Sequence, residues 1–171
     1  MFVKQSKTSY YLDRIESSTK ILAKLSDSIG QYVLIFMVIL VIGNIILRKF
    51  WKPIYGSYDY ISFTNAVFVT LTLGYCAIKK NNVAIEFLVK HFSKKFSRFI
   101  NIIVYFTGFC IFSLITKEFI VLARELAHVH EVSGTAYIPI SPFLYIEAYG
   151  FGVLSLINLI YFLKSIYNKQ T

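Results

Sequence analysis

Residues 29–47, IGQYVLIFMVILVIGNIIL, form one long apolar segment. It contains no charged residue, and its apolar residues are continuous and do not alternate with polar ones. At about 1.5 Å per residue it covers roughly 28 Å, close to the thickness of the hydrocarbon core of a bilayer. We therefore predict that this segment crosses a membrane as an α-helix.

Three further segments share this length and composition: residues 61–78, 99–123 and 143–163. The segment at 99–123 is the longest and contains Lys117 and Glu118, so we expect it to tilt or to extend beyond the bilayer. The sequence thus predicts an all-α integral membrane protein with four transmembrane helices, folded as a single membrane domain over residues 1–171.

The composition agrees with a membrane protein. The 171 residues are 56% hydrophobic and carry a formal net charge of +9, whereas a soluble domain is much less apolar. In a soluble protein this charge would suggest nucleic acid. Here the Lys and Arg residues flank the apolar segments, so we expect the phospholipid bilayer as the partner and no nucleic acid.

The distribution of Lys and Arg predicts the topology. Most of them lie in the N-terminal segment, in residues 79–98 and in the C-terminal tail. By the positive-inside rule both termini and residues 79–98 are cytoplasmic, while loops 48–60 and 124–142 lie on the other side. In a bacterium, a multi-pass protein of the inner membrane with this topology would have these two loops in the periplasm.

Two segments outside the spans have an amphipathic pattern. In residues 83–98 apolar side chains recur at three- and four-residue spacing with polar side chains opposite them, which predicts a helix lying in the cytoplasmic interface. Its expected anchor residues are Ile85, Leu88, Lys90, Phe92, Lys94, Lys95, Phe96 and Arg98. Residues 8–28 show a weaker version of the pattern and predict a second, N-terminal interfacial helix.

Each span contains one asparagine. These are Asn44, Asn65, Asn101 and Asn158. We expect some of them to form hydrogen bonds between helices, each worth roughly 0.6–2 kcal/mol. Small residues spaced four apart, Thr70 with Gly74 and Ala148 with Gly152, would allow close approach of helices. A polar ion path is the alternative use of the four amides.

The sequence gives little sign of catalysis. The spans hold few ionisable side chains, and His91, His128 and His130 all lie outside them. Glu147 is near the start of the fourth span, where a helix dipole stabilises a carboxylate. There is no phosphate-binding glycine loop and no metalloprotease motif, so we predict no enzyme activity, no cofactor and no metal site.

Several short motifs follow one another in the order of a known family. Arg48, Pro53 and Asp59 come between the first two spans, and Gly74, a Lys79–Lys80 pair and NVAIEFL (82–88) follow. IPISPFLYIEAYGFG (138–152) then leads into the fourth span. This arrangement resembles the small, DctQ-like membrane subunit of tripartite ATP-independent periplasmic (TRAP) transporters over roughly residues 25–165. The chain has Asn82 and Glu86 where the family often has His and Asp.

The resemblance implies a function. Such a subunit supports a large elevator-type membrane subunit, which moves an organic acid such as sialic acid or a C4-dicarboxylate with a sodium gradient, and a periplasmic binding protein delivers the substrate. Candidate docking residues on the outer side are Arg48, Lys49, Trp51, Lys52, Tyr55, Tyr58, Asp59 and Glu147. An aromatic belt at the headgroup level is the alternative role of the loop aromatics. Two other functions stay open, a stand-alone exporter of small molecules and the membrane anchor of a quinone-linked enzyme.

Overall fold

The computed structural model describes the backbone of residues 7–89 and 94–167 and the side chains of residues 14–79 and 99–166. The described residues form four α-helices, α1 (Lys7–Phe50), α2 (Ser57–Val89), α3 (Lys94–His128) and α4 (Ser141–Tyr167). Each helix contains an apolar window long enough to cross a membrane. The predicted all-α fold with four candidate transmembrane helices is confirmed.

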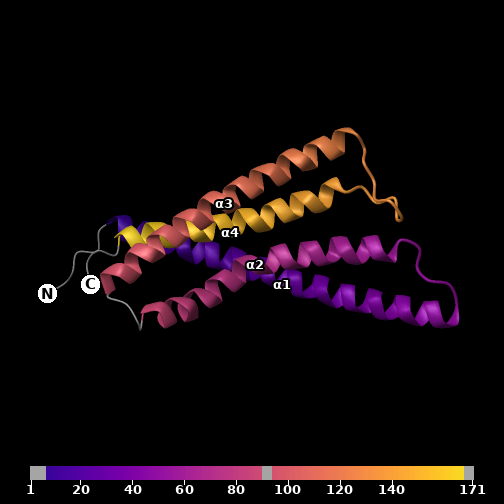
Figure 1. Ribbon diagram of the computed structural model, residues 1–171, viewed down its shortest axis with the longest axis horizontal. Helices are drawn as coiled ribbons and strands as arrows, with labels where there is room; N and C mark the ends of the chain where they lie inside the picture. The colour runs from indigo at the N-terminus through magenta and orange to yellow at the C-terminus, as the bar shows by residue number, and fades with distance from the viewer. Residues whose placement is uncertain (1–6, 90–93, 168–171) are drawn as a thin grey trace.

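The helices are arranged as two antiparallel hairpins, α1–α2 and α3–α4 (Figure 1). The hairpins lie together near the chain termini and splay apart toward the two connecting loops (Figure 1). α4 contacts each of the other three helices, and a larger share of its apolar window is buried than in α1, α2 or α3. α4 is therefore the central helix of the bundle.

The two amphipathic segments are continuous with the spanning helices, which differs from the separate interfacial helices that the sequence suggested. Residues 8–28 form part of α1 and run without a break into residues 29–47. Residues 83–89 end α2 and residues 94–98 begin α3, while residues 90–93 lie outside the described part. No proline lies at the junctions near residues 28 and 80, so helical hydrogen bonding continues through the change from apolar to charged side chains.

The core lies where α1, α2 and α4 meet. A Cβ atom on Gly150 of α4 would lie only 2.6 Å from the carbonyl oxygen of Thr70 in α2, so only glycine fits there. Gly74 of α2 faces Val153 of α4, and Ala23 of α1 belongs to the same buried cluster. In a membrane, where lipid competes with apolar side chains, such close backbone contact is a main source of helix association.

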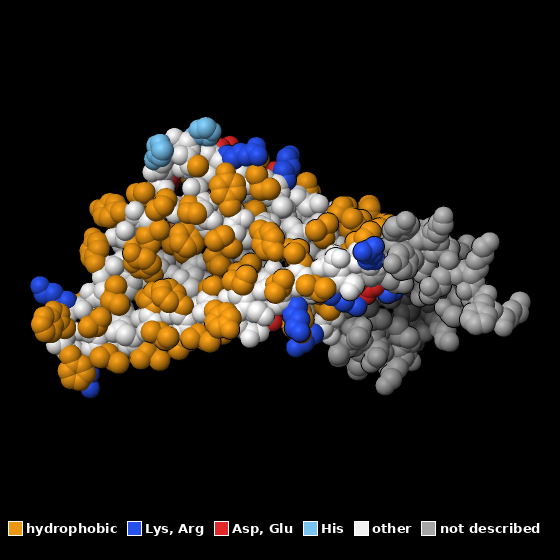
Figure 2. Space-filling view, turned by 180° about the vertical axis from the view of Figure 1, so that it is seen from behind, with side chains coloured by type: hydrophobic (Ala, Val, Ile, Leu, Met, Phe, Trp, Pro, Cys, Tyr) orange, Lys and Arg blue, Asp and Glu red, His pale blue; other side chains and the backbone are white. Residues whose placement is uncertain are grey.

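A charged cluster closes the bundle at the end where the termini lie. The Glu16 carboxylate of α1 forms ion pairs with Lys20, one turn further along, and with Lys164 of α4, each at 2.6 Å. Figure 2 shows hydrophobic side chains over most of the described surface, with Lys and Arg side chains in small groups at the loop tip and along the edges. A predominantly apolar outer surface is what contact with lipid would require.

Candidate docking surface at the loop end of the bundle

The connection between α1 and α2 ends α1 in a defined way. Pro53 cannot continue a helix, and α1 ends three residues before it at Phe50. The backbone N–H of Ile54 donates a hydrogen bond to Oδ1 of Asn44 at 3.0 Å. The side chain of Asn44 in α1 therefore fixes the start of the α1–α2 connection to α1, and the contact stays within one hairpin.

This connection presents aromatic and cationic side chains. Trp51 is 81% exposed and Tyr58 is 79% exposed, and Tyr55 is exposed to a similar degree. Arg48, Lys49 and Lys52 are exposed beside them, and Figure 2 shows hydrophobic and cationic side chains together at this end of the molecule. Trp, Tyr and Arg are the residue types that most often anchor protein interfaces. We call Arg48, Lys49, Trp51, Lys52, Tyr55 and Tyr58 the hairpin tip.

Asp59 joins the hairpin tip to the other loop. One carboxylate oxygen, Oδ2, accepts hydrogen bonds from the backbone N–H of Thr135 at 2.9 Å, from the Thr135 hydroxyl at 2.6 Å and from the backbone N–H of Ala136 at 2.8 Å. Hydrogen bonds to an ionised acceptor are about twice as strong as those between neutral groups. We call this contact the Asp59 latch. It connects the two hairpins at the end where their helices splay apart.

Glycine makes the latch possible. Gly56 has φ +71°, and a Cβ atom there would lie 2.5 Å from the Cβ of Ala136. The residue just before α2 therefore needs both the left-handed conformation and the space that only glycine leaves. The connection between the hairpins is built on this close approach.

The loop between α3 and α4 has its own internal order. Val132 and Pro139 form an isolated antiparallel bridge, and the N–H of Ser133 donates to the carbonyl oxygen of Ile138 at 2.9 Å. Ser133 is buried, and its hydroxyl accepts a hydrogen bond from the N–H of Ile138 at 3.3 Å. This short turn holds residues 135 and 136 in place for the Asp59 latch.

The structure also places the remaining sequence-predicted residues. Glu147 is half-buried on α4. Asn158 donates to the carbonyl oxygen of Leu154 in its own helix at 2.9 Å, and its Oδ1 would lie 3.0 Å from a Cβ on Gly108 of α3. Asn101 is half-buried, whereas Asn65 is exposed on α2.

The expected interfacial anchor lies outside the part of the chain whose side chains the structure describes. Lys90 and Phe92 lie outside the described residues, and the side chains of Ile85, Leu88, Lys94, Lys95, Phe96 and Arg98 lie outside the described side chains. Among the described residues, no group of three or more His, Cys, Asp or Glu side chains lies close enough to hold a metal ion.

Sequence reasoning missed a carboxylate inside the bundle. Asp27 is only 7% exposed and accepts a hydrogen bond from Nε2 of Gln31 at 2.8 Å. The amphipathic pattern of residues 8–28 predicts that Asp27 lies at the interface, whereas the structure places it within the candidate span Arg14–Phe50. The spacing of Ala23, Ser26 and Gly30 around it marks a helix face of small residues and could have revealed the burial.

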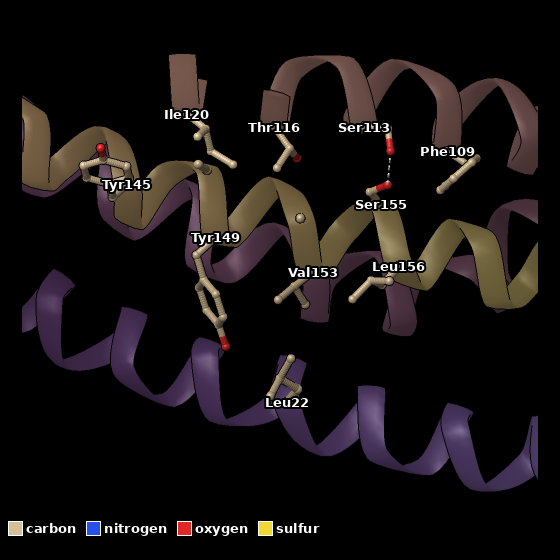
Figure 3. Close-up of a pocket in the computed structure, with 12 residues that line it drawn as sticks. Leu22, Phe109, Ser113, Thr116, Ile120, Tyr145, Tyr149, Val153, Ser155 and Leu156 are labelled. Carbon is tan, nitrogen blue, oxygen red and sulfur yellow. Dashed lines mark hydrogen bonds between the residues drawn. The ribbon is translucent and has the colours of Figure 1, made fainter. Parts of the chain in front are cut away.

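An open groove runs along α4 between α1 and α3 (Figure 3). Its volume is about 540 Å³, and Tyr149 points from its floor toward α1, where its hydroxyl lies 3.3 Å from Oγ of Ser26. The hydroxyls of Ser113 and Ser155 are hydrogen bonded across α3 and α4 at 3.3 Å. No Lys, Arg, His, Asp or Glu lines the groove, so it offers no charged site for an organic acid.

Four helices that are each long and apolar enough to span a bilayer indicate a multi-pass membrane protein. Residues 37–167 match the family described as tripartite ATP-independent periplasmic transporters, DctQ component. This match covers most of the chain, and the chain belongs to that family: it is a small membrane subunit of a TRAP transporter. The family consists of transporter components and not of enzymes. No curated protein and no solved structure matches the chain.

Proposed function

We propose that this chain is the fixed scaffold of a sodium-coupled TRAP transporter for an organic acid of the sialic acid or C4-dicarboxylate class. It supports the large elevator-type subunit, has no transport site of its own, and helps dock the periplasmic substrate-binding protein. Family membership implies both partners. The proposed location of the protein is the inner membrane. Both termini would lie in the cytoplasm, and the hairpin tip and the 129–140 loop would lie in the periplasm.

The observation that carries the docking role is the braced hairpin tip. Exposed aromatic and cationic side chains are common on protein surfaces, but here they stand on a connection fixed at two points. Asn44 binds the backbone of Ile54 on one side, and Asp59 binds Thr135 and Ala136 on the other. A preorganised surface loses less conformational entropy when a partner binds. This arrangement suits a dock better than it suits a belt of aromatics at the headgroups, which needs no bracing.

The groove along α4 supports the absence of a transport site. An anionic substrate crossing the membrane needs compensating positive charge along its path. The groove is lined by apolar and hydroxyl side chains and contains no cationic side chain. The scaffold role is also consistent with the Lys and Arg side chains at the hairpin tip and with Lys20 and Lys164 at the opposite end, because moving such charges into hydrocarbon costs about 3 kcal/mol each.

Reversing charge on the hairpin tip tests the docking role. We expect the double variant Arg48→Glu, Lys52→Glu to reduce uptake about tenfold when the binding protein is limiting, because charges at an interface mainly raise the rate of encounter. Uptake should recover toward the wild-type rate when the binding protein is in excess.

The matched control is Lys24→Glu, an exposed cation on α1 toward its opposite end. This variant should keep the wild-type dependence on binding-protein concentration. Wild-type uptake by the double variant at limiting binding protein would show that the hairpin tip is not part of the dock.

A further inference from the structure

We propose that one face of α2 binds a transmembrane helix of the large subunit through a hydrogen bond to Asn65. The face consists of Tyr58, Ser62, Asn65 and Val69, and we call it the α2 outer stripe. This inference rests on the proposed function, since it names the surface through which the scaffold would hold its partner.

The geometry of α2 leaves this face open. Phe63 stacks on Phe143 of α4 with ring centroids 4.7 Å apart, Thr70 lies against Gly150 of α4, and Leu71 lies against Gly30 of α1. Tyr58, Ser62, Asn65 and Val69 are all exposed and recur at four- and three-residue spacing. At 3.6 residues per turn, that spacing puts them on one line along the helix, on the side turned away from α4.

The carboxamide of Asn65 requires a hydrogen-bonding partner if it lies inside a membrane. It lies eight residues after Ser57, about 12 Å along the helix axis and within the span Ser57–Lys79. Its amide forms no hydrogen bond with any residue that the structure describes, whereas Asn44 and Asn158 both have hydrogen-bonding partners. Acyl chains of lipids can neither donate nor accept a hydrogen bond, so a carboxamide facing them loses the hydrogen bonds it makes in water.

The exposed surface of α1 at the same depth makes a useful contrast. Phe36 lines a pocket together with Thr64 of α2, and the exposed residues of α1 there include Ile35, Phe36 and Ile39, which suit lipid tails. On α2 the exposed positions include a hydroxyl and a carboxamide, both small enough for another backbone to come close. A neighbouring membrane helix with a hydrogen-bonding side chain satisfies this face, and a lipid does not. Because the chain is one component of a multi-component transporter, the occupant is the large subunit.

The test uses the complete transporter with the large subunit tagged. Replacing Asn65 with Leu should weaken association of the two membrane subunits about 3- to 30-fold, the range expected for an interhelical hydrogen bond in a membrane. Asn65→Gln keeps the carboxamide and should recover part of that loss. Thr107→Leu, which removes an exposed polar group from α3, is the matched control and should leave affinity unchanged.

A photoreactive amino acid at position 65 identifies the occupant directly. A cross-link to the large subunit supports the proposal, whereas cross-links to lipid alone or to a second copy of this chain would overturn it. Wild-type affinity in Asn65→Leu, or an equal loss in Thr107→Leu, would also overturn it. If the wild-type chain does not associate with a large subunit at all, the proposed function itself fails, which is a separate result.

Discussion

Replacing Gly150 with Ala should destabilise the bundle by about 1–3 kcal/mol, because the added Cβ atom would meet the backbone of α2. It would lie 2.6 Å from the carbonyl oxygen and 2.8 Å from the carbonyl carbon of Thr70. Backbone atoms cannot rotate out of the way as a side chain can, so α2 and α4 must move apart. The midpoint of thermal unfolding in detergent, followed by circular dichroism, measures the loss.

Gly43→Ala provides the matched control. Gly43 is also inside a spanning helix, but a Cβ atom there would have no neighbour within 4 Å. Alanine restricts the unfolded chain more than glycine does, so this variant should be unchanged or about 0.4–1 kcal/mol more stable. Equal destabilisation by both substitutions would mean that α2 and α4 do not approach at Gly150.

Replacing Asp59 with Ala should separate the two loops and reduce uptake about tenfold at limiting binding protein, on the scale of a lost interface anchor. The substitution removes the single oxygen that accepts hydrogen bonds from Thr135 and Ala136. Spin labels at positions 55 and 134, in a chain without Cys76 and Cys110, would report the distance between the loops. A narrow distance distribution in the wild-type chain should become broad in Asp59→Ala.

Asp59→Asn distinguishes the hydrogen bonds from the volume of the side chain. The carboxamide oxygen still accepts hydrogen bonds but carries no full charge, so this variant should show a smaller effect than Asp59→Ala. A narrow distance distribution in Asp59→Ala would contradict the latch, and full uptake by that variant would separate the latch from docking.

The sequence was most informative where a pattern is local. The apolar continuity of residues 29–47 and 143–163 predicted the spans, because helix length and hydrophobicity alone determine what can cross a bilayer. Local patterns did not show where the helices end. The charged residues Lys79 and Lys80 suggested a boundary, yet α2 continues to Val89, because charge ends a membrane span but does not end a helix.

The sequence pattern does not indicate contacts between residues that are far apart in the chain. Asp59 is 76 residues from Thr135, and nothing near either residue indicates the other. Gly150 lies between Ala148 and Gly152, the pair that the small-residue spacing indicates, and only the rotation of α4 about its axis brings Gly150 against α2. The sequence shows that Asn65 is a polar residue within a span, but its direction, away from α4, depends on how the helices pack.

The central proposal is that this chain is a scaffold that does not transport by itself. The most direct test measures uptake of radiolabelled substrate into vesicles, driven by an inward sodium gradient and with the binding protein outside. The vesicles contain the chain alone, the large subunit alone, or both. We expect accumulation only where both membrane subunits are present. Substrate accumulation in vesicles that contain this chain alone would contradict the proposal.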